Sequence, residues 1–350
     1  MKYIINTGCS YGVMFMSFRE FTKGNNNDFK IIDLHCDSTG ADYAKRSIIY
    51  TVSKLIETGV SPNDMYVITE WSQPNRLHIE LPQEFCDEIL NDKPHTEKTF
   101  VLDNTFNRIE NEFPINFVDK FKSLSTIFDD RVYANIEHSD LQSFDNKNIK
   151  YYIKEFLKNS PINNKPIDRL ESYLTNILDL QSFLKSLNIG YSFFLMNNTF
   201  EGYYDGSYTN LTHTDETRQL FKKDKILLPN FKSLVQLKDF SDYLKKTWNL
   251  IDLSNFHFYK TDNFNYGGID EYSMEKFGHK CYFAGANPWD IPNDGSYVTG
   301  FGAHPHESIY VNFFIDYMYD KLKPFIGELE FHFTDRWSRT KHNSIRNMNK

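Results

Sequence analysis

The chain has 350 residues, which suits one large α/β domain with insertions or two modest domains. Its net charge of −8 argues against a general nucleic-acid binder, because such a protein needs a basic face to neutralise phosphates. No run reaches the ~20 apolar residues that a membrane helix needs, so we expect no membrane span.

None of the four cysteines forms a C-x-x-C pair, which argues against a zinc ribbon or a redox motif. A chain of this size does not depend on disulfides, so we expect reduced thiols in a cytosolic setting. Only three apolar residues separate Lys2 from Asn6, far short of a signal-peptide core. The sequence therefore predicts a protein without a signal peptide, and no pattern in it calls for a metal or a cofactor.

The first elements in chain order indicate a parallel sheet. Apolar runs predict buried strands over residues 2–9, 29–36 and 65–71. Between the last two, apolar residues at helical spacing predict a helix over 42–58, and Gly59 is placed to end it. This strand–helix–strand order predicts parallel pairing with a right-handed crossover.

The rest of the chain alternates between clear elements and long polar segments. We expect a single α/β domain over 1–350, with insertions at about 82–165 and 200–250. The first insertion reads as short helical pieces and polar loops. The remaining predicted elements are a helix over 167–188, a strand over 191–196, a strand over 255–259, a loop over 284–305 and a helix over 308–322.

Ser10 is the first candidate for chemistry. It lies in the turn Gly8-Cys9-Ser10, directly after the first predicted strand. The carboxyl end of a strand is where open α/β sheets place their sites. A serine hydroxyl is a weak nucleophile that needs a base and oxyanion donors. Serine is also common in turns, so Ser10 alone is weak evidence.

Three further pieces lie at the ends of predicted elements. Gly40 precedes the first helix and allows a close approach to its N–H. The loop Glu70-Trp71-Ser72-Gln73-Pro74-Asn75-Arg76 follows the third strand. His304 and His306 flank Pro305 just before the last helix, where either could act as a base. Each piece alone is an ordinary loop feature, but four in this chain order favour a site.

Together these residues resemble the SGNH (GDSL-type) hydrolases. Gly8-Cys9-Ser10 resembles their first block, with Cys9 in the place of aspartate, and Gly40 resembles the second. The loop after the third strand resembles the third block, and Ala303-His304-Pro305 the fifth. The resemblance covers about residues 1–76 and 280–322 and is closest to divergent, phage-type members.

The resemblance implies a flavodoxin-like three-layer α/β/α sandwich with a parallel sheet. Ser10 would be the nucleophile and His304 the base. The oxyanion hole would use the N–H groups of Ser10 and Gly40, with a third donor from Ser72 or Asn75. A cytoplasmic or virion-associated setting follows from the phage-type likeness.

The chain departs from the family at the acid. The family's aspartate, three residues before the histidine, falls on Phe301 here. Asp290 or Asp294 from the same loop, or a backbone carbonyl, are the candidates to orient His304. The third-block asparagine falls near Ser72, which is a shorter donor, and Asn75 is close by.

Other residues rank lower as sites. The run His213-Thr214-Asp215-Glu216 indicates a solvated loop rather than a metal site, because the sequence has no second cluster of metal-ligating residues to pair with it. His35-Cys36-Asp37 reads as a pocket wall rather than a zinc site. We expect Cys9 to point into the sheet layer rather than to act as a nucleophile.

The sequence thus predicts a serine ester hydrolase acting on a small-molecule or carbohydrate ester, with O-acetyl groups as one candidate. The alternative is a non-catalytic phage structural or glycan-binding protein that keeps the fold. A third reading is an acyltransferase on the same fold. We expect neither nucleic acid nor a membrane among the partners of the protein.

Overall fold

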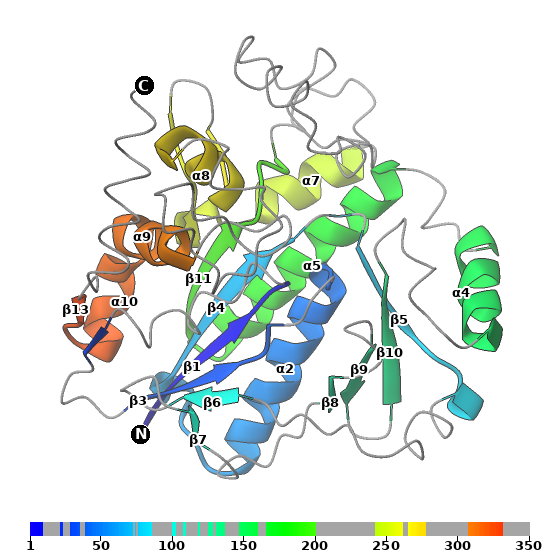
Figure 1. The fold of residues 1–350 in the computed structure, drawn as a ribbon, viewed down its shortest axis with the longest axis horizontal. Helices are drawn as coiled ribbons and strands as arrows, with labels where there is room; N and C mark the ends of the chain where they lie inside the picture. Colours follow the sequence, from blue (N-terminus) through cyan, green and yellow to red (C-terminus); the bar gives the residue numbers. More distant parts are fainter. Residues whose placement is uncertain are drawn as a thin grey trace, which may run out of the picture.

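A computed structural model shows the arrangement of the chain (Figure 1). It describes residues 1–9, 22–23, 29–35, 39–72, 74, 76–85, 100–102, 108–109, 118–119, 125–128, 131–136, 147–159, 166–200, 242–261, 265–277 and 307–331. The predicted α/β class is confirmed, because helices pack on a sheet with five parallel strands.

The main sheet has the spatial order β12-β11-β4-β1-β3-β6-β7. The first five run parallel, and β6 and β7 are antiparallel additions beyond β3. Every residue of β4 is buried, as expected of a strand covered on both faces. The strands are β1 (Lys2–Thr7), β3 (Phe29–Asp33), β4 (Met65–Trp71), β6 (Phe100–Leu102), β7 (Arg108–Ile109), β11 (Gly190–Leu195) and β12 (Phe256–His257).

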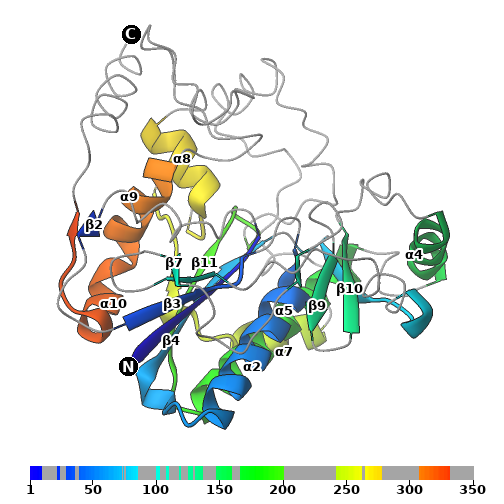
Figure 2. The same ribbon diagram turned by 60° about the horizontal axis from the view of Figure 1, so that its bottom comes forward.

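Apolar side chains of the parallel strands alternate between two core clusters. Ile5 and Val67 join a cluster with α2 (Ala41–Glu57), α5 (Pro166–Ser186) and α7 (Asp242–Leu250). Ile4 and Ile68 join the other cluster, with α8 (Ile269–Phe277), α9 (Glu307–Tyr317) and α10 (Tyr319–Ile326). Successive residues of a strand point to opposite faces, so the two helix groups cover opposite faces of the sheet (Figure 2).

Helix α2 matches the helix predicted over 42–58 within one residue. Its last turn ends as a Schellman motif: Gly59 N–H donates to Ile56 O at 2.9 Å and Val60 N–H to Leu55 O at 3.0 Å. Gly59 has φ of +91°, which favours glycine at this position. The predicted role of Gly59 in ending the helix is confirmed.

A second, antiparallel sheet has the order β5-β10-β9-β8. It contacts α2 at two side chains of the helix: Tyr43 packs edge-on against the His78 ring, and Arg46 lies over the Tyr133 ring. The prediction of helical pieces and loops over 82–165 missed the three strands of this sheet within that range, although it fits α4 (Lys147–Asn159). The strands are β5 (Leu77–Glu80), β8 (Val118–Asp119), β9 (Ser125–Phe128) and β10 (Arg131–Ile136).

The chain ends differ in detail from the prediction. The helix predicted over 308–322 is two helices, α9 and α10, separated at Met318. After α10, β13 (Glu330–Phe331) pairs antiparallel with β2 (Thr22–Lys23). Most of the predicted insertion at 200–250 and the loop at 284–305 lie outside the described residues. Among the helices that the structure describes, none has the length and apolarity of a membrane span.

Candidate functional site

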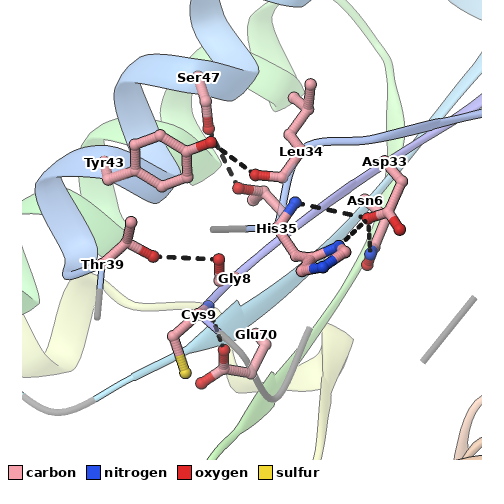
Figure 3. A network of polar contacts seen from close by, with 11 residues as sticks. Asn6, Gly8, Cys9, Asp33, Leu34, His35, Thr39, Tyr43, Ser47 and Glu70 are labelled. Carbon is pink, nitrogen blue, oxygen red and sulfur yellow. Dashed lines mark hydrogen bonds and ion pairs between the residues drawn. The ribbon is translucent and has the colours of Figure 1, made fainter. Parts of the chain in front are cut away.

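The order of the strands in the sheet reverses between β1 and β4. From β1 it continues to β3 on one side, whereas from β4 it continues to β11 on the other. In open α/β sheets, ligands bind outside the carboxyl ends of the strands at such a switch point. We call the region formed by the carboxyl ends of β1, β3, β4 and β11 the carboxyl edge. Figure 3 shows part of its polar network.

The turn after β1 is hydrogen-bonded to two other segments of the chain. Thr39 Oγ1 donates to Gly8 O at 3.0 Å, and Cys9 N–H donates to Glu70 Oε2 at 2.7 Å (Figure 3). The Cys9 thiol is buried in the core and lies 3.8 Å from Met196 Sδ. This confirms that Cys9 points into the sheet layer. The next residue along the chain is Ser10.

Glu70 is a buried carboxyl at the end of β4, with 1% of its surface exposed. Burial raises the pKa of this carboxyl above its usual value, although hydrogen bonds from Cys9 and the charges of Arg76 and His35 oppose the shift. Its second oxygen, Oε1, is buried and has no hydrogen-bond partner among the described residues. An unsatisfied buried oxygen is costly, so Glu70 marks the carboxyl edge as a functional candidate.

Thr39 and Gly40 directly precede α2 and complete the contacts between the loops. Ser72 Oγ donates to Thr39 O at 2.6 Å, so Thr39 is joined to the loops after both β1 and β4. Gly40 is the N-cap residue of α2, and a Cβ at this position would overlap the backbone carbonyl of Arg76. No described residue accepts a hydrogen bond from Gly40 N–H. Because Gly40 is at the N-terminus of α2, this N–H group lies at the positive end of the helix dipole.

At the end of β3, a carboxylate and a histidine form a pair. Asp33 Oδ1 accepts a hydrogen bond from Asn6 Nδ2 at 2.8 Å and lies 3.0 Å from His35 Nδ1. The Asp33 side chain is fully buried, whereas the His35 side chain is 16% exposed. Figure 3 shows both residues beside the turn that carries Gly8 and Cys9. The carboxyl edge thus combines a fixed acid, a histidine, a second buried carboxyl and a helix N-terminus.

Comparisons of the chain with protein-family models, with curated proteins and with solved structures gave no match. Function is therefore inferred from the geometry of the carboxyl edge.

The structure brings two of the predicted site residues together. Gly40 and Ser72 meet at Thr39. The Ser72 hydroxyl proton points at Thr39 O, so the hydroxyl could reach an oxyanion only by leaving that bond. The remaining predicted residues lie outside the described part of the chain: Ser10, Asn75, His304, His306, Asp290, Asp294 and the run at 213–216.

Sequence reasoning named Glu70 only as part of the segment after the third strand, and it did not name Asp33 or Asn6 as site residues. The available signal was a polar residue at or near the last position of each apolar strand. Burial of these side chains depends on neighbouring strands, so residue type alone cannot show it. Among the residues that the structure describes, no group of three or more histidine, cysteine or carboxylate side chains could hold a metal ion.

A serine–histidine contact lies within the sheet, away from the carboxyl edge. His257 Nε2 lies 2.9 Å from Ser192 Oγ, which is 2.8 Å from Tyr66 OH. Burial lowers the pKa of His257 to about 4, so its ring is neutral at pH 7. Ser192 is 1% exposed and lies in the body of β11, away from the strand ends. We interpret this trio as a buried polar link between strands, because no substrate could reach Ser192.

Proposed function

We propose that the protein is a serine ester hydrolase in which Ser10 is acylated at the carboxyl edge. One observation carries the proposal: the two residues before Ser10 are each hydrogen-bonded to a different segment of the edge, Gly8 to Thr39 just before α2 and Cys9 to Glu70 near the end of β4. Such contacts restrict where the next residue can lie, and a nucleophile depends on fixed geometry. The turn also lies beside the switch point between β1 and β4.

The fold supports the same proposal. Numbered along the chain, the five parallel strands have the spatial order 2-1-3-4-5, which is the order of flavodoxin-like doubly wound sheets. Helices on both faces fit a three-layer α/β/α sandwich. We therefore propose this architecture for the chain, with the SGNH-type resemblance as its sequence counterpart.

The edge supplies donors for the charge that develops in acyl transfer. When Ser10 Oγ attacks an ester carbonyl, the carbonyl oxygen becomes negative and needs N–H groups directed at it. Gly40 N–H, at the N-terminus of α2, is such a donor, and Ser10 N–H is the second in this proposal. Hydrolysis of the acyl-enzyme by water releases the acid. An O-acetylated carbohydrate is one candidate substrate.

The proposal is tested with a fluorophosphonate probe and with p-nitrophenyl acetate. The wild type should be labelled and should turn over the ester, whereas Ser10→Ala should do neither. Ser186→Ala is the matched control, because Ser186 is an exposed hydroxyl at the end of α5, before the amino end of β11. Absence of labelling and of turnover above a heat-treated sample would contradict the proposal.

The second candidate is a non-catalytic glycan-binding or phage structural protein with the same fold. The Ser72 contact favours it, because the hydroxyl at the third-block position donates to Thr39 O rather than standing ready for an oxyanion. In that case Ser10→Ala would bind glycans as the wild type does, with neither protein labelled. An acyltransferase would be labelled like a hydrolase but would yield more product when a sugar acceptor is added.

A further inference from the structure

We propose that Asp33 and His35 form the acid–histidine pair that takes the proton of Ser10, an inference that rests on the proposed function. His35 would be the catalytic base, and Asp33 the positioning residue that orients its ring. The sequence led us to expect His35 to be a pocket wall and His304 to be the base. The structure favours His35 because of its acid partner, its register beside the turn and its exposure.

The acid partner is fixed before any substrate binds. Asp33 is fully buried, and Asn6 Nδ2 donates to its Oδ1 at 2.8 Å. The same oxygen lies 3.0 Å from His35 Nδ1, which directs Nε2 away from the acid (Figure 3). The two atoms lie at ion-pair distance without the angle of a good hydrogen bond, and catalytic hydrogen bonds are often poorly aligned without substrate.

The strand register places His35 beside the turn. Asn6 pairs with Asp33, and Leu34 N–H donates to Asn6 O at 2.8 Å, so the parallel pairing continues past the end of β3. By this register His35 is opposite Gly8, across a strand spacing of about 4.8 Å. Ser10 follows Gly8 by two residues, and two residues of chain span at most about 7 Å. The register therefore brings His35 opposite the residue that lies two positions before Ser10.

His35 also lies on the correct face of the sheet. Asn6, Asp33 and Glu70 occupy the strand positions that alternate with the residues of the α2 face, so their side chains point to the face covered by α9. The charge of His35 is one of the factors that lower the pKa of Glu70, which places the two groups within electrostatic range. His35 and the turn bonded to Glu70 therefore share one side of the carboxyl edge.

The other histidines of the described residues do not fit the role. His78 is buried and stacks on Tyr133 at 4.6 Å between ring centroids, in the second sheet. His257 is buried in contact with Ser192. His304, the base implied by the family resemblance, has Phe301 in the position of the family's acid. Asp33 and His35 supply a histidine and its orienting carboxylate together, as activation of a serine requires.

In this proposal, ester hydrolysis proceeds in two halves, acylation of Ser10 and hydrolysis of the acyl-enzyme. The Ser10 Oγ–H proton passes to His35 Nε2 while Oγ bonds to the ester carbonyl carbon. The bond from this carbon to the leaving oxygen then breaks, and His35 returns the proton to the departing alcohol. In the second half, His35 takes a proton from the attacking water, the acid leaves, and Ser10 regains its proton. Asp33 stabilises the charged ring in both halves without itself changing protonation.

The decisive experiment compares histidine variants in ester turnover and fluorophosphonate labelling rate. His35→Gln should lower both on the order of 10²–10⁴-fold, the contribution expected of a general base. His35→Ala should recover turnover when free imidazole is added, which a purely structural role of His35 would not produce. His35→Gln with wild-type rates, while His304→Gln abolishes labelling, would overturn the inference and leave the proposed function intact.

Asp33→Asn tests the positioning role. An amide at this position can still accept from Asn6 but favours the wrong tautomer of His35, so kcat should fall by up to about 10⁴-fold with KM little changed. In a His35→Gln background the same change should have no further effect on kcat, because the two residues act as one unit. Additive losses would overturn the pairing. A wild type that is never labelled would contradict both proposals.

Discussion

The backbone N–H of Cys9 donates to Glu70 Oε2 at 2.7 Å, which joins the ends of β1 and β4 at the switch point of the sheet. The bond crosses 61 residues of sequence and ends on a carboxyl group that is almost fully buried. A buried carboxyl in this position affects the stability of the fold as well as the geometry of the turn.

Glu70→Gln should change the dependence of stability on pH. Folding raises the pKa of Glu70, so the folded protein binds this proton more tightly than the unfolded chain. The wild type therefore loses stability as pH rises above about 4.5, through the window up to the raised pKa. The amide keeps an acceptor for Cys9 N–H but does not ionise.

Urea unfolding of both proteins between pH 4 and 8 checks this expectation. The stability of Glu70→Gln relative to wild type should increase with pH. Glu57→Gln, an exposed position at the end of α2, is the control for loss of a carboxyl group. A constant difference between Glu70→Gln and wild type across the range would contradict the raised pKa.

Gly40→Ala should destabilise the protein by about 1–3 kcal/mol, the usual cost of overpacking. The added Cβ would overlap the Arg76 carbonyl, and a backbone atom cannot move aside as a flexible side chain can. Gly40→Ser separates this contact from capping, because serine is a better N-cap but carries the same Cβ. Thermal unfolding should show a loss in both variants, and a gain in Gly40→Ser would refute the steric explanation.

Ser72→Ala should cost about 1–3 kcal/mol, because it leaves the buried Thr39 carbonyl without the hydroxyl that now donates to it. Ser186→Ala is the matched control, since Ser186 donates to Phe183 O at an exposed helix end. Its effect should stay within about 0.5 kcal/mol. Equal effects of the two substitutions in urea unfolding would show that the Ser72 contact contributes little.

His257 should make the protein sensitive to acid. Its pKa is lowered on folding to about 4, mainly by burial, so the unfolded chain binds the proton more tightly. Stability should fall as pH drops from about 6.5 to about 4, by on the order of 3 kcal/mol in total. His257→Gln should flatten this slope in chemical unfolding measured at each pH. An unchanged slope would assign the acid sensitivity to other groups.

Sequence patterns predict the elements that are long and regular. They give β4 with the bounds seen in the structure and α2 within one residue, because buried runs and helical spacing are local properties. The strands β8, β9 and β10 are not predicted. They have two to six residues each, and β10 pairs with β5, about fifty residues earlier in the chain.

In the site, too, local features can be predicted from the sequence, whereas features that depend on contacts between distant residues cannot. Gly40 is predictable because a glycine before a helix has a local meaning. The importance of Asp33 and Glu70 depends on Asn6 and Cys9, which reach them through pairing of separate strands, and on His35, which contacts Asp33 from two residues along the chain. Residue type and spacing show that polar groups end these strands, but not that the groups are buried or which of them meet.

Thr39 couples the movement of the loop after β1 to that of the loop after β4. Its hydroxyl donates to Gly8 O, and its carbonyl accepts from Ser72, so the loop after β1 cannot shift away from the loop after β4 without straining one residue at the start of a 17-residue helix. A compound that displaces either loop must break the bond of that loop to Thr39 or move Thr39 with it. The three segments should then open together, and their amide protons should exchange with solvent with one common free energy rather than three.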